Sequence, residues 1–355
     1  MSISFLSTQL LSVENLSVSF KTSRGLVKAN ENISFEIKEG EIFGLIGETG
    51  CGKTTLGKAL LRLLSNNARI EGRIVYRGKN ILSLSEKEMR SLRGKKIGIM
   101  LQDPSICFNP VLSVGSQIAE IYRYHEGMRK KDAEKKASEM LELVGIDSSR
   151  KSEYPHQFSG GMLQRIMIAV ALALKPRLLI ADEPTKGLDP DMKLQILEII
   201  TKLVRKENSS MLLITHDLDV ATKLTDRTAV MYAGEIVEIG KTATVISDPK
   251  HPYTFALLHS LPEKGLMTVL GQSPSLISPP FGCRYHPRCS NQLADCSKIH
   301  PELLEHVDDH FVRCLLSEKN SKNVRRKGSK NVRREAQLIP DTPSPGCAEV
   351  GVWHC

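Results

Sequence analysis

The sequence predicts an α/β fold built around a parallel sheet, and two observations predict it. Four short apolar runs, IFGLI, IGIML, LLIA and MLLIT, have the length and composition of buried parallel strands. The first run leads into a glycine-rich loop, and the others lead into Gln102, Asp182 and His216. Ligands bind beyond the carboxyl ends of the strands in such sheets. We therefore expect the four strand ends to share one site.

The glycine-rich loop GETGCGKTT follows the first apolar run and precedes a helical pattern, TLGKALLRLL. It fits G-x-x-x-x-G-K-[ST] in the strand–loop–helix context that this phosphate-binding motif requires. Its glycines let backbone N–H groups surround phosphates, while Lys53 adds a positive charge and Thr54 can ligate magnesium. The motif predicts a nucleotide site contacted by Gly47, Glu48, Thr49, Gly50, Cys51, Gly52, Lys53, Thr54 and Thr55.

The polar residues at the other strand ends suit phosphoryl transfer to water. We expect oxygen ligands for Mg²⁺ from Thr54, Gln102 and Asp182, and a water-activating carboxylate from Glu183. Gln102 and His216 would contact the γ-phosphate region. Taken singly, each has another interpretation: Gln102 as a turn residue, Asp182 as a helix cap, and His216 as a hydrogen-bonded core histidine.

A second anion-binding feature is the segment FSGGMLQR, residues 158–165, which precedes the apolar run IMIAVALALK. Ser159 is predicted to be the N-cap of a helix, and Gly160 and Gly161 leave backbone N–H groups accessible at its start. Such a terminus attracts an anion. The segment has no lysine and lies more than a hundred residues from the phosphate-binding loop. A plain capped helix is the alternative interpretation.

In that order, GETGCGKT, Gln102, FSGGMLQR, LLIADEPTKGLD and ITHD resemble the nucleotide-binding subunit of an ATP-binding-cassette (ABC) transporter. The resemblance spans about residues 10–240. It implies a P-loop NTPase fold of ABC type with an antiparallel β subdomain and a helical subdomain at about 103–165. In this family the LSGGQ-type segment faces the γ-phosphate held by the other subunit of a head-to-tail dimer, which implies that Ser159, Gly160 and Gly161 act across a dimer interface.

The resemblance implies further roles. Phe20 would stack on adenine, and Asp189 would lie in the loop that crosses the dimer interface. TKGLD replaces the more usual TSALD, which places Lys186 at that interface. The segment DPSICFNPV resembles the stretch that meets the membrane subunit in oligopeptide and dipeptide importers. In DAEKKASEMLELVG, an apolar stripe is predicted to pack within the helical subdomain; it comprises Ala133, Ala137, Met140, Leu141 and Val144.

We divide the chain into an ATPase domain, 1–245, a C-terminal extension, 246–316, and a basic, disordered tail, 317–355. The extension begins with DPKHPYTFALLHSLP, which resembles peptide-importer ATPases. Its cysteines have the spacing C-x5-C-x6-C-x17-C, which matches a motif that holds a 4Fe–4S cluster in some of these ATPases. A zinc site and unligated thiols remain alternatives, although no C-x2-4-C pair is present. The cysteines are Cys283, Cys289, Cys296 and Cys314.

Composition and charge limit the partners. The 355 residues are 41% hydrophobic and 25% charged, as in globular proteins. Eight of the nine net positive charges lie between Lys319 and Arg334, so the rest of the chain is nearly neutral. We interpret the basic segment as a solvated, disordered extension and expect no nucleic acid; contact with RNA, DNA or anionic lipid is the alternative. The N-terminus lacks the basic segment of a signal peptide, and no run approaches the ~20 apolar residues that span a bilayer. We expect a soluble chain that reaches a membrane through partners.

The resemblance therefore predicts the ATP-hydrolysing subunit of an importer of oligopeptides or dipeptides, peripheral on the cytoplasmic face of the cell membrane. Its expected partners are a second, non-identical ABC ATPase, two transmembrane permease subunits and, indirectly, an extracytoplasmic peptide-binding protein. An importer of another small solute such as nickel is an alternative. So is a soluble ABC ATPase of DNA repair or translation, but the chain has neither a long coiled-coil insertion nor a second cassette.

Overall fold

A computed structural model describes residues 9–260, 271–307 and 309–317, and it contains two β-sheets. The smaller sheet has the strand order β2-β1-β4-β5 and is antiparallel. This arrangement confirms the predicted antiparallel subdomain. Its strands are β1 (Gln9–Thr22), β2 (Gly25–Lys38), β4 (Ala68–Tyr76) and β5 (Lys79–Asn80).

The larger sheet has eight strands in the order β11-β12-β10-β9-β3-β8-β7-β6. From β9 to β6 the neighbouring strands are parallel, and β10, β12 and β11 are antiparallel. The four apolar runs of the sequence are adjacent parallel strands: β3 (Ile42–Ile46), β8 (Ser210–Thr215), β7 (Leu178–Asp182) and β6 (Ile97–Met100). The remaining strands are β9 (Arg227–Tyr232), β10 (Glu235–Lys241), β11 (Leu304–Val307) and β12 (His310–Val312).

Three hydrophobic cores cover the parallel strands of the described residues, and the smallest packs Ile46 of β3 and Val230 of β9 against the helices that follow β8 and β10. The two larger cores join the sheets and the other helices. One joins the small sheet to the large sheet and includes Leu56 of helix α1 (Lys53–Leu60). The other joins the large sheet to α3 (Val114–Glu126), α4 (Lys130–Leu143), α5 (Gly160–Leu172) and α6 (Pro190–Lys206). The shorter helices are α2 (Glu86–Leu92), α7 (Leu218–Leu224), α8 (Thr242–Ser247) and α9 (Pro252–His259).

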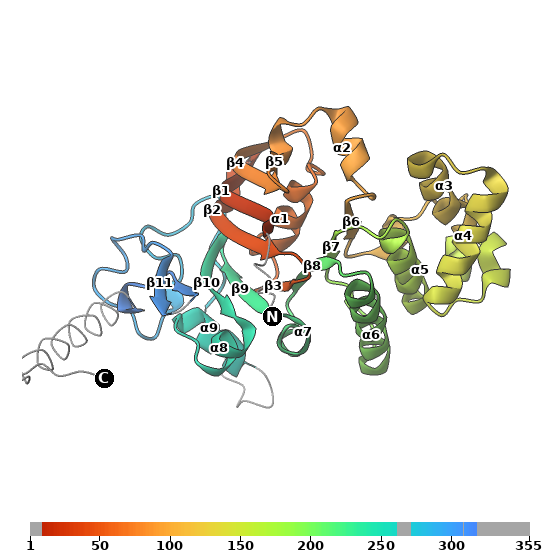
Figure 1. The fold of residues 1–355 in the computed structure, drawn as a ribbon. Coiled ribbons are helices and arrows are strands. Elements are labelled where there is room, and N and C mark those ends of the chain that lie inside the picture. The colour runs from red at the N-terminus through yellow and green to blue at the C-terminus, as the bar shows by residue number, and fades with distance from the viewer. Residues whose placement is uncertain (1–8, 261–270, 308, 318–355) are drawn as a thin grey trace, which may run out of the picture.

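Figure 1 shows α3, α4 and α5 grouped on one side of the molecule and β11, the edge strand of the larger sheet, on the other, with the small sheet between them. The group α3–α5 lies in the region of the predicted helical subdomain, but α5 ends at Leu172, past the predicted bound of about 165. The five residues of the predicted apolar stripe on α4 and its C-cap are all buried in the core that these helices share, so the stripe packs within its own subdomain, as predicted: Ala133, Ala137, Met140, Leu141 and Val144.

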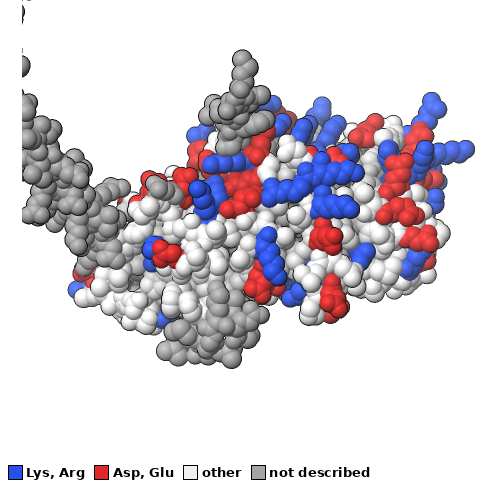
Figure 2. Space-filling model, turned by 60° about the horizontal axis from the view of Figure 1, so that its bottom comes forward, with Lys and Arg blue, Asp and Glu red and all other residues white. Residues whose placement is uncertain are grey.

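The C-terminal extension continues the sheet of the ATPase. Strand β12 pairs with β10 through Glu238 opposite Val312 and Ile239 opposite Phe311, and β11 pairs with β12. The basic segment between Lys319 and Arg334 lies outside the described residues. On the face drawn in Figure 2, Lys and Arg side chains lie among Asp and Glu, consistent with a nearly neutral body. Among the described residues, no helix has the length and apolar composition needed to cross a membrane.

Candidate functional site

The phosphate-binding loop joins β3 to α1, and its backbone requires glycine at two positions. Gly47 has φ +153°, and an added Cβ there would lie 2.1 Å from the Met231 carbonyl oxygen. Gly52 has φ +109°, and an added Cβ would lie 2.3 Å from the Ala29 carbonyl oxygen. Because both contacts are with backbone, neither can be relieved by a side-chain rotation. The glycines therefore let the loop pack directly against neighbouring backbone.

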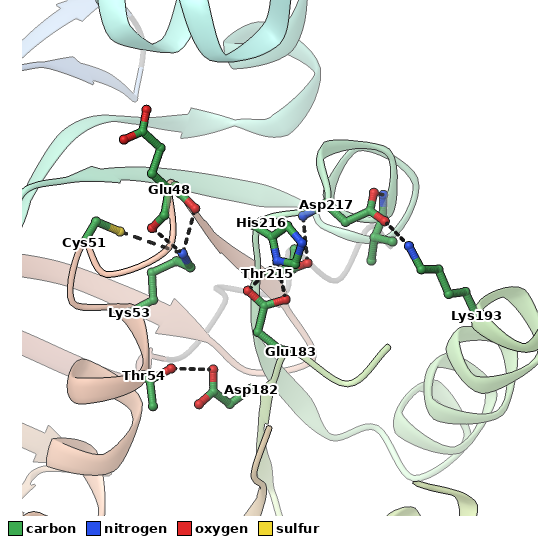
Figure 3. A network of polar contacts seen from close by, with 12 residues as sticks. Glu48, Cys51, Lys53, Thr54, Asp182, Glu183, Lys193, Thr215, His216 and Asp217 are labelled. Carbon is green, nitrogen blue, oxygen red and sulfur yellow. Dashed lines mark hydrogen bonds and ion pairs between the residues drawn. The ribbon is translucent and has the colours of Figure 1, made fainter. Parts of the chain in front are cut away.

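The N-terminus of α1 is arranged to receive an anion. Gly52 is its N-cap and supplies no side-chain cap, and the first turn holds no acidic residue. The Lys53 ammonium is buried and donates to the carbonyl oxygens of Gly47 at 2.7 Å and Glu48 at 2.9 Å (Figure 3). Uncapped N–H groups, the helix dipole and one lysine charge thus lie within one loop.

Asp182 ends β7 beside the start of α1. The Thr54 hydroxyl donates to Asp182 Oδ1 at 3.1 Å, and Asp182 is only 1% exposed. Burial raises the pKa of the Asp182 carboxyl, the Thr54 hydrogen bond opposes this shift, and the charge of Glu183 adds to it. A hydroxyl and a carboxylate are the oxygen ligands that Mg²⁺ prefers. The pair therefore fits the predicted magnesium site.

Glu183 follows Asp182 in a backbone conformation that is rare for glutamate, with φ +50°. Its N–H donates to the Ile214 carbonyl oxygen of β8 at 2.9 Å, which fixes this conformation. Both carboxylate oxygens lie 2.8 Å from Nδ1 of His216, as Figure 3 shows. The His216 side chain is 53% exposed and the Glu183 side chain 10% exposed. His216 is therefore not a buried core histidine.

Gln102 lies two residues beyond the end of β6 and is half-buried. Because β6 pairs in parallel with β7, Gln102 and Asp182 lie at the same edge of the sheet. The structure thus gathers the predicted residues of the loop, β6, β7 and β8 at one edge. The stretch that follows Gln102 exposes apolar side chains, with Ile106 80% and Val111 74% exposed.

Ser159 is the N-cap of α5, as predicted, and its hydroxyl accepts the Met162 N–H at 3.4 Å. Gly160 is exposed and an added Cβ there would meet nothing within 4 Å, whereas one at Gly161 would lie 3.0 Å from Met192 Sδ. Figure 1 shows α5 well apart from α1. Within one chain, the structure does not bring the SGG segment to the phosphate-binding loop.

The remaining residues of the predicted nucleotide site lie at element ends. Phe20, near the end of β1, is partly buried against the core that joins the two sheets. Asp189 is exposed and is the N-cap of α6, where Oδ1 accepts the Met192 N–H at 2.9 Å. Lys186, in the loop between Glu183 and α6, is exposed to solvent.

Two residues that hold this site were not predicted from the sequence. Gln164 of α5 is buried and donates a short hydrogen bond to the carbonyl oxygen of Pro184, the residue after Glu183. Tyr253 of α9 accepts the backbone N–H of Glu48 at 3.0 Å through its hydroxyl. The sequence did carry a signal for Gln164, because this amide lies at the start of an otherwise apolar helical run. No local pattern indicated Tyr253, because its partner is about 200 residues away.

The four cysteines of the extension are free thiols, and two of them, Cys296 and Cys314, are each 7% exposed. Burial raises the pKa of Cys283 to about 12, and its backbone N–H donates to the Cys296 carbonyl oxygen. Among the described residues, no three His, Cys, Asp or Glu side chains form a group that could hold a metal ion. The structure therefore does not support the predicted iron–sulfur cluster or zinc site.

Comparison with known proteins agrees with this site. Residues 30–186 match the family described as ABC transporter, and residues 237–296 match the oligopeptide/dipeptide transporter C-terminal region. The chain is 43% identical over 329 residues to the dipeptide transport ATP-binding protein DppD of Bacillus subtilis, covering 90% of this chain and 98% of that protein. It is 40% identical over 299 residues to the oligopeptide transport ATP-binding protein OppD of Salmonella typhimurium, covering 82% and 89%.

Among solved structures, the ATP-binding cassette MJ0796, in a dimeric post-hydrolysis state bound to ADP and Pi, matches with a TM-score of 0.60. It is 26% identical and covers 66% of this chain and 99% of its own. The fold and the site thus define a nucleotide-binding cassette, an ATPase that uses ATP and Mg²⁺. The chain belongs to the ABC transporter family, in the branch of dipeptide and oligopeptide transport ATP-binding proteins.

Proposed function

We propose that this chain hydrolyses ATP to drive the uptake of dipeptides or oligopeptides through partner membrane subunits. The observation that carries the proposal is the carboxyl edge of the sheet, where Lys53, Asp182, Glu183 and His216 converge. This edge occurs in a chain similar over 90% of its length to a dipeptide transport ATP-binding protein. The match of residues 237–296 to a peptide-transporter region supports the peptide class of cargo.

The chain's own groups divide the work of hydrolysis. The N–H groups of the loop and the Lys53 ammonium bind the β- and γ-phosphates. Thr54, Asp182 and Gln102 would hold Mg²⁺, which neutralises phosphate charge when bound. Glu183 orients the attacking water and accepts its proton, because its backbone is held at the sheet edge by the Ile214 contact and its carboxylate by His216. His216 fixes that carboxylate and contacts the γ-phosphate.

We propose that the site is completed by a second cassette. The N-terminus of α5 carries Ser159, Gly160 and Gly161 and is apart from the loop of its own chain, so it would face the γ-phosphate held by a partner. Asp189 would lie at the same interface, and Phe20 would stack on adenine. The dimeric state of the similar cassette MJ0796 supports this arrangement. We propose that the second cassette is non-identical to this chain.

The assembly is proposed to include two permease subunits and an extracytoplasmic peptide-binding protein, which places this chain on the cytoplasmic face of the membrane. The exposed apolar side chains after Gln102 suit a contact with a permease subunit. We propose that the chain divides into an ATPase domain, 1–245, a C-terminal extension, 246–316, and a basic tail, 317–355.

The iron–sulfur cluster is a separate proposal supported by cysteine spacing alone. Iron and zinc analysis of anaerobically purified chain tests it: about four irons support the cluster, and one zinc or no metal contradicts it.

The hydrolysis proposal is tested with Glu183→Gln in the full chain mixed with its partner cassette. ATP binding should persist, kcat should fall by about 10²–10⁴-fold, and an ATP-bound dimer of the two cassettes should accumulate in size-exclusion chromatography. Glu198→Gln removes an exposed carboxylate from α6 and serves as the matched control. Undiminished hydrolysis by Glu183→Gln would exclude Glu183 as the base.

The trans arrangement is tested with Ser159→Arg, which should keep ATP binding by the chain but abolish hydrolysis by the chain mixed with its partner cassette, with exposed Ser149→Arg as its control. Loss of binding itself would contradict a trans role for Ser159. Mixing Ser159→Arg with Lys53→Met tests which cassettes pair. In a dimer of identical chains, one intact site would form in the mixed dimer and activity would return. We expect no return, because the proposed partner cassette is a different chain.

A further inference from the structure

The C-terminal extension contacts the phosphate-binding loop through Arg288. The Arg288 guanidinium forms a two-pronged ion pair with Glu48, with Nη1 3.0 Å from Oε2 and Nη2 3.1 Å from Oε1. The Arg288 side chain is 7% exposed and the Glu48 side chain 24% exposed. The Ser273 hydroxyl also donates to the Glu48 carboxylate. A largely buried, bidentate pair of this kind is among the stronger polar contacts in proteins.

Glu48 is held at its backbone as well as at its carboxylate. The Tyr253 hydroxyl accepts the Glu48 N–H at 3.0 Å, and Arg288 also donates to the Tyr232 hydroxyl at 3.3 Å. The rings of Tyr232 and Tyr253 pack with centroids 4.6 Å apart. Two residues from beyond position 245 therefore hold Glu48: Tyr253 at its backbone N–H and Arg288 at its carboxylate.

A second line of contacts reaches the loop at Cys51. Arg284 is 5% exposed, pairs with Glu31 and with Glu235, and donates to the Ala233 carbonyl oxygen. The next residue, Gly234, donates its N–H to the Cys51 carbonyl oxygen at 2.9 Å. The extension thus contacts the loop directly at Glu48. It contacts Cys51 indirectly, through the segment Ala233–Gly234.

The charge of Glu48 makes the contact with Arg288 relevant to nucleotide binding. Glu48 directly follows Gly47 in a loop that receives phosphates, and an unpaired carboxylate there would repel a polyphosphate. Figure 3 shows the Glu48 carboxylate directed away from Thr54 and Asp182. Arg288 both neutralises this carboxylate and holds it in that direction.

We propose that Arg288 is a positioning residue for nucleotide binding, acting through Glu48, and that the C-terminal extension is therefore part of the nucleotide site's support. This inference rests on the proposed nucleotide site. It predicts that loss of Arg288 weakens nucleotide binding because the Glu48 charge is released, and that loss of the Glu48 charge relieves this effect.

The test is a double-mutant cycle in the full chain, with Kd for MgADP and MgATP measured by isothermal titration. Arg288→Met should raise Kd about tenfold at low salt, and the increase should shrink as ionic strength rises, because it is electrostatic. The double variant Arg288→Met with Glu48→Gln should return Kd to within about threefold of the wild type. Lys298→Met removes an exposed cation from the same extension and is the matched control.

Arg288→Lys keeps the charge but loses the two-pronged contact, so it should raise Kd by about threefold, and it remains informative where Arg288→Met does not fold. Thermal unfolding checks the fold of every variant. Arg288→Met with wild-type affinity, or a weakened affinity that Glu48→Gln does not relieve, would overturn the inference. If the wild-type chain itself binds no MgADP, the proposed nucleotide site fails instead.

Discussion

The buried His251 should make the stability of this protein depend on pH in mildly acidic solution. His251 is 1% exposed, and its Nδ1 accepts the Tyr253 N–H at 3.0 Å as the N-cap of α9. Burial lowers the pKa of His251 from 6.5 to about 4; Glu238 and Glu235 oppose this shift and Arg313 adds to it. Protonation would also destroy the acceptor that caps the helix.

The direction follows from proton binding in the two states. Below pH 6.5 the unfolded chain takes up a proton at His251, and the folded chain does not do so until pH falls to about 4. Folding stability is therefore lost as pH falls through this window and is unaffected above it. At 1.36 kcal/mol per pKa unit, the full loss is about 3 kcal/mol, of which about 2 kcal/mol is reached by pH 5.

The assay is guanidinium unfolding of the nucleotide-free chain from pH 7.5 to pH 4.5, compared with His251→Asn. Asparagine keeps a cap acceptor and does not titrate, so the variant should be less stable at pH 7.5 through lost packing. Its deficit relative to the wild type should shrink by about 2 kcal/mol at pH 5. Exposed His156→Asn should run parallel to the wild type. A constant deficit of His251→Asn at every pH would refute the reasoning.

Three other predictions concern the site. Gly47→Ala should abolish nucleotide binding in equilibrium titrations, because its Cβ would lie 2.1 Å from the Met231 carbonyl oxygen. Gln164→Leu leaves the Pro184 carbonyl without its buried donor and should lower the free energy of unfolding by about 1–3 kcal/mol in denaturant titrations, with a reduced kcat. Ile106→Asp, at a side chain that is 80% exposed, should leave ATP hydrolysis by the chain unchanged but reduce peptide uptake by reconstituted transporter vesicles.

Each of these three predictions has a control variant or a result that would contradict it. Gly50→Ala adds only the strain of φ +83°, because its Cβ meets nothing within 4 Å, so it should be milder than Gly47→Ala; equal effects would exclude the clash with Met231 as the cause. Exposed Gln292→Leu should change the free energy of unfolding by less than about 0.5 kcal/mol. An equally small change for Gln164→Leu would show that its hydrogen bond to Pro184 does not stabilise the fold. Full uptake by Ile106→Asp would exclude a permease contact at that residue.

The sequence by itself determined what depends on local spacing. The phosphate-binding loop needs glycines at particular backbone positions, so its motif is readable in one short segment. The apolar runs of β3, β6, β7 and β8 are strand-length, and the stripe on α4 has helical period, so the elements were predictable too. Ser159 was predictable as an N-cap because its hydroxyl bonds an N–H only three residues away.

Only the tertiary structure decided which distant residues meet. The contact of Glu183 with His216 depends on β7 lying beside β8, and the contact of Arg288 with Glu48 joins residues 240 positions apart. The extension proved to continue the ATPase sheet through β12, although the resemblance had suggested a separate segment after residue 245. The spacing of the four cysteines likewise could not determine whether their thiols lie close enough to hold a metal. Strand order and side-chain direction are set by burial over the whole chain, and no local pattern records them.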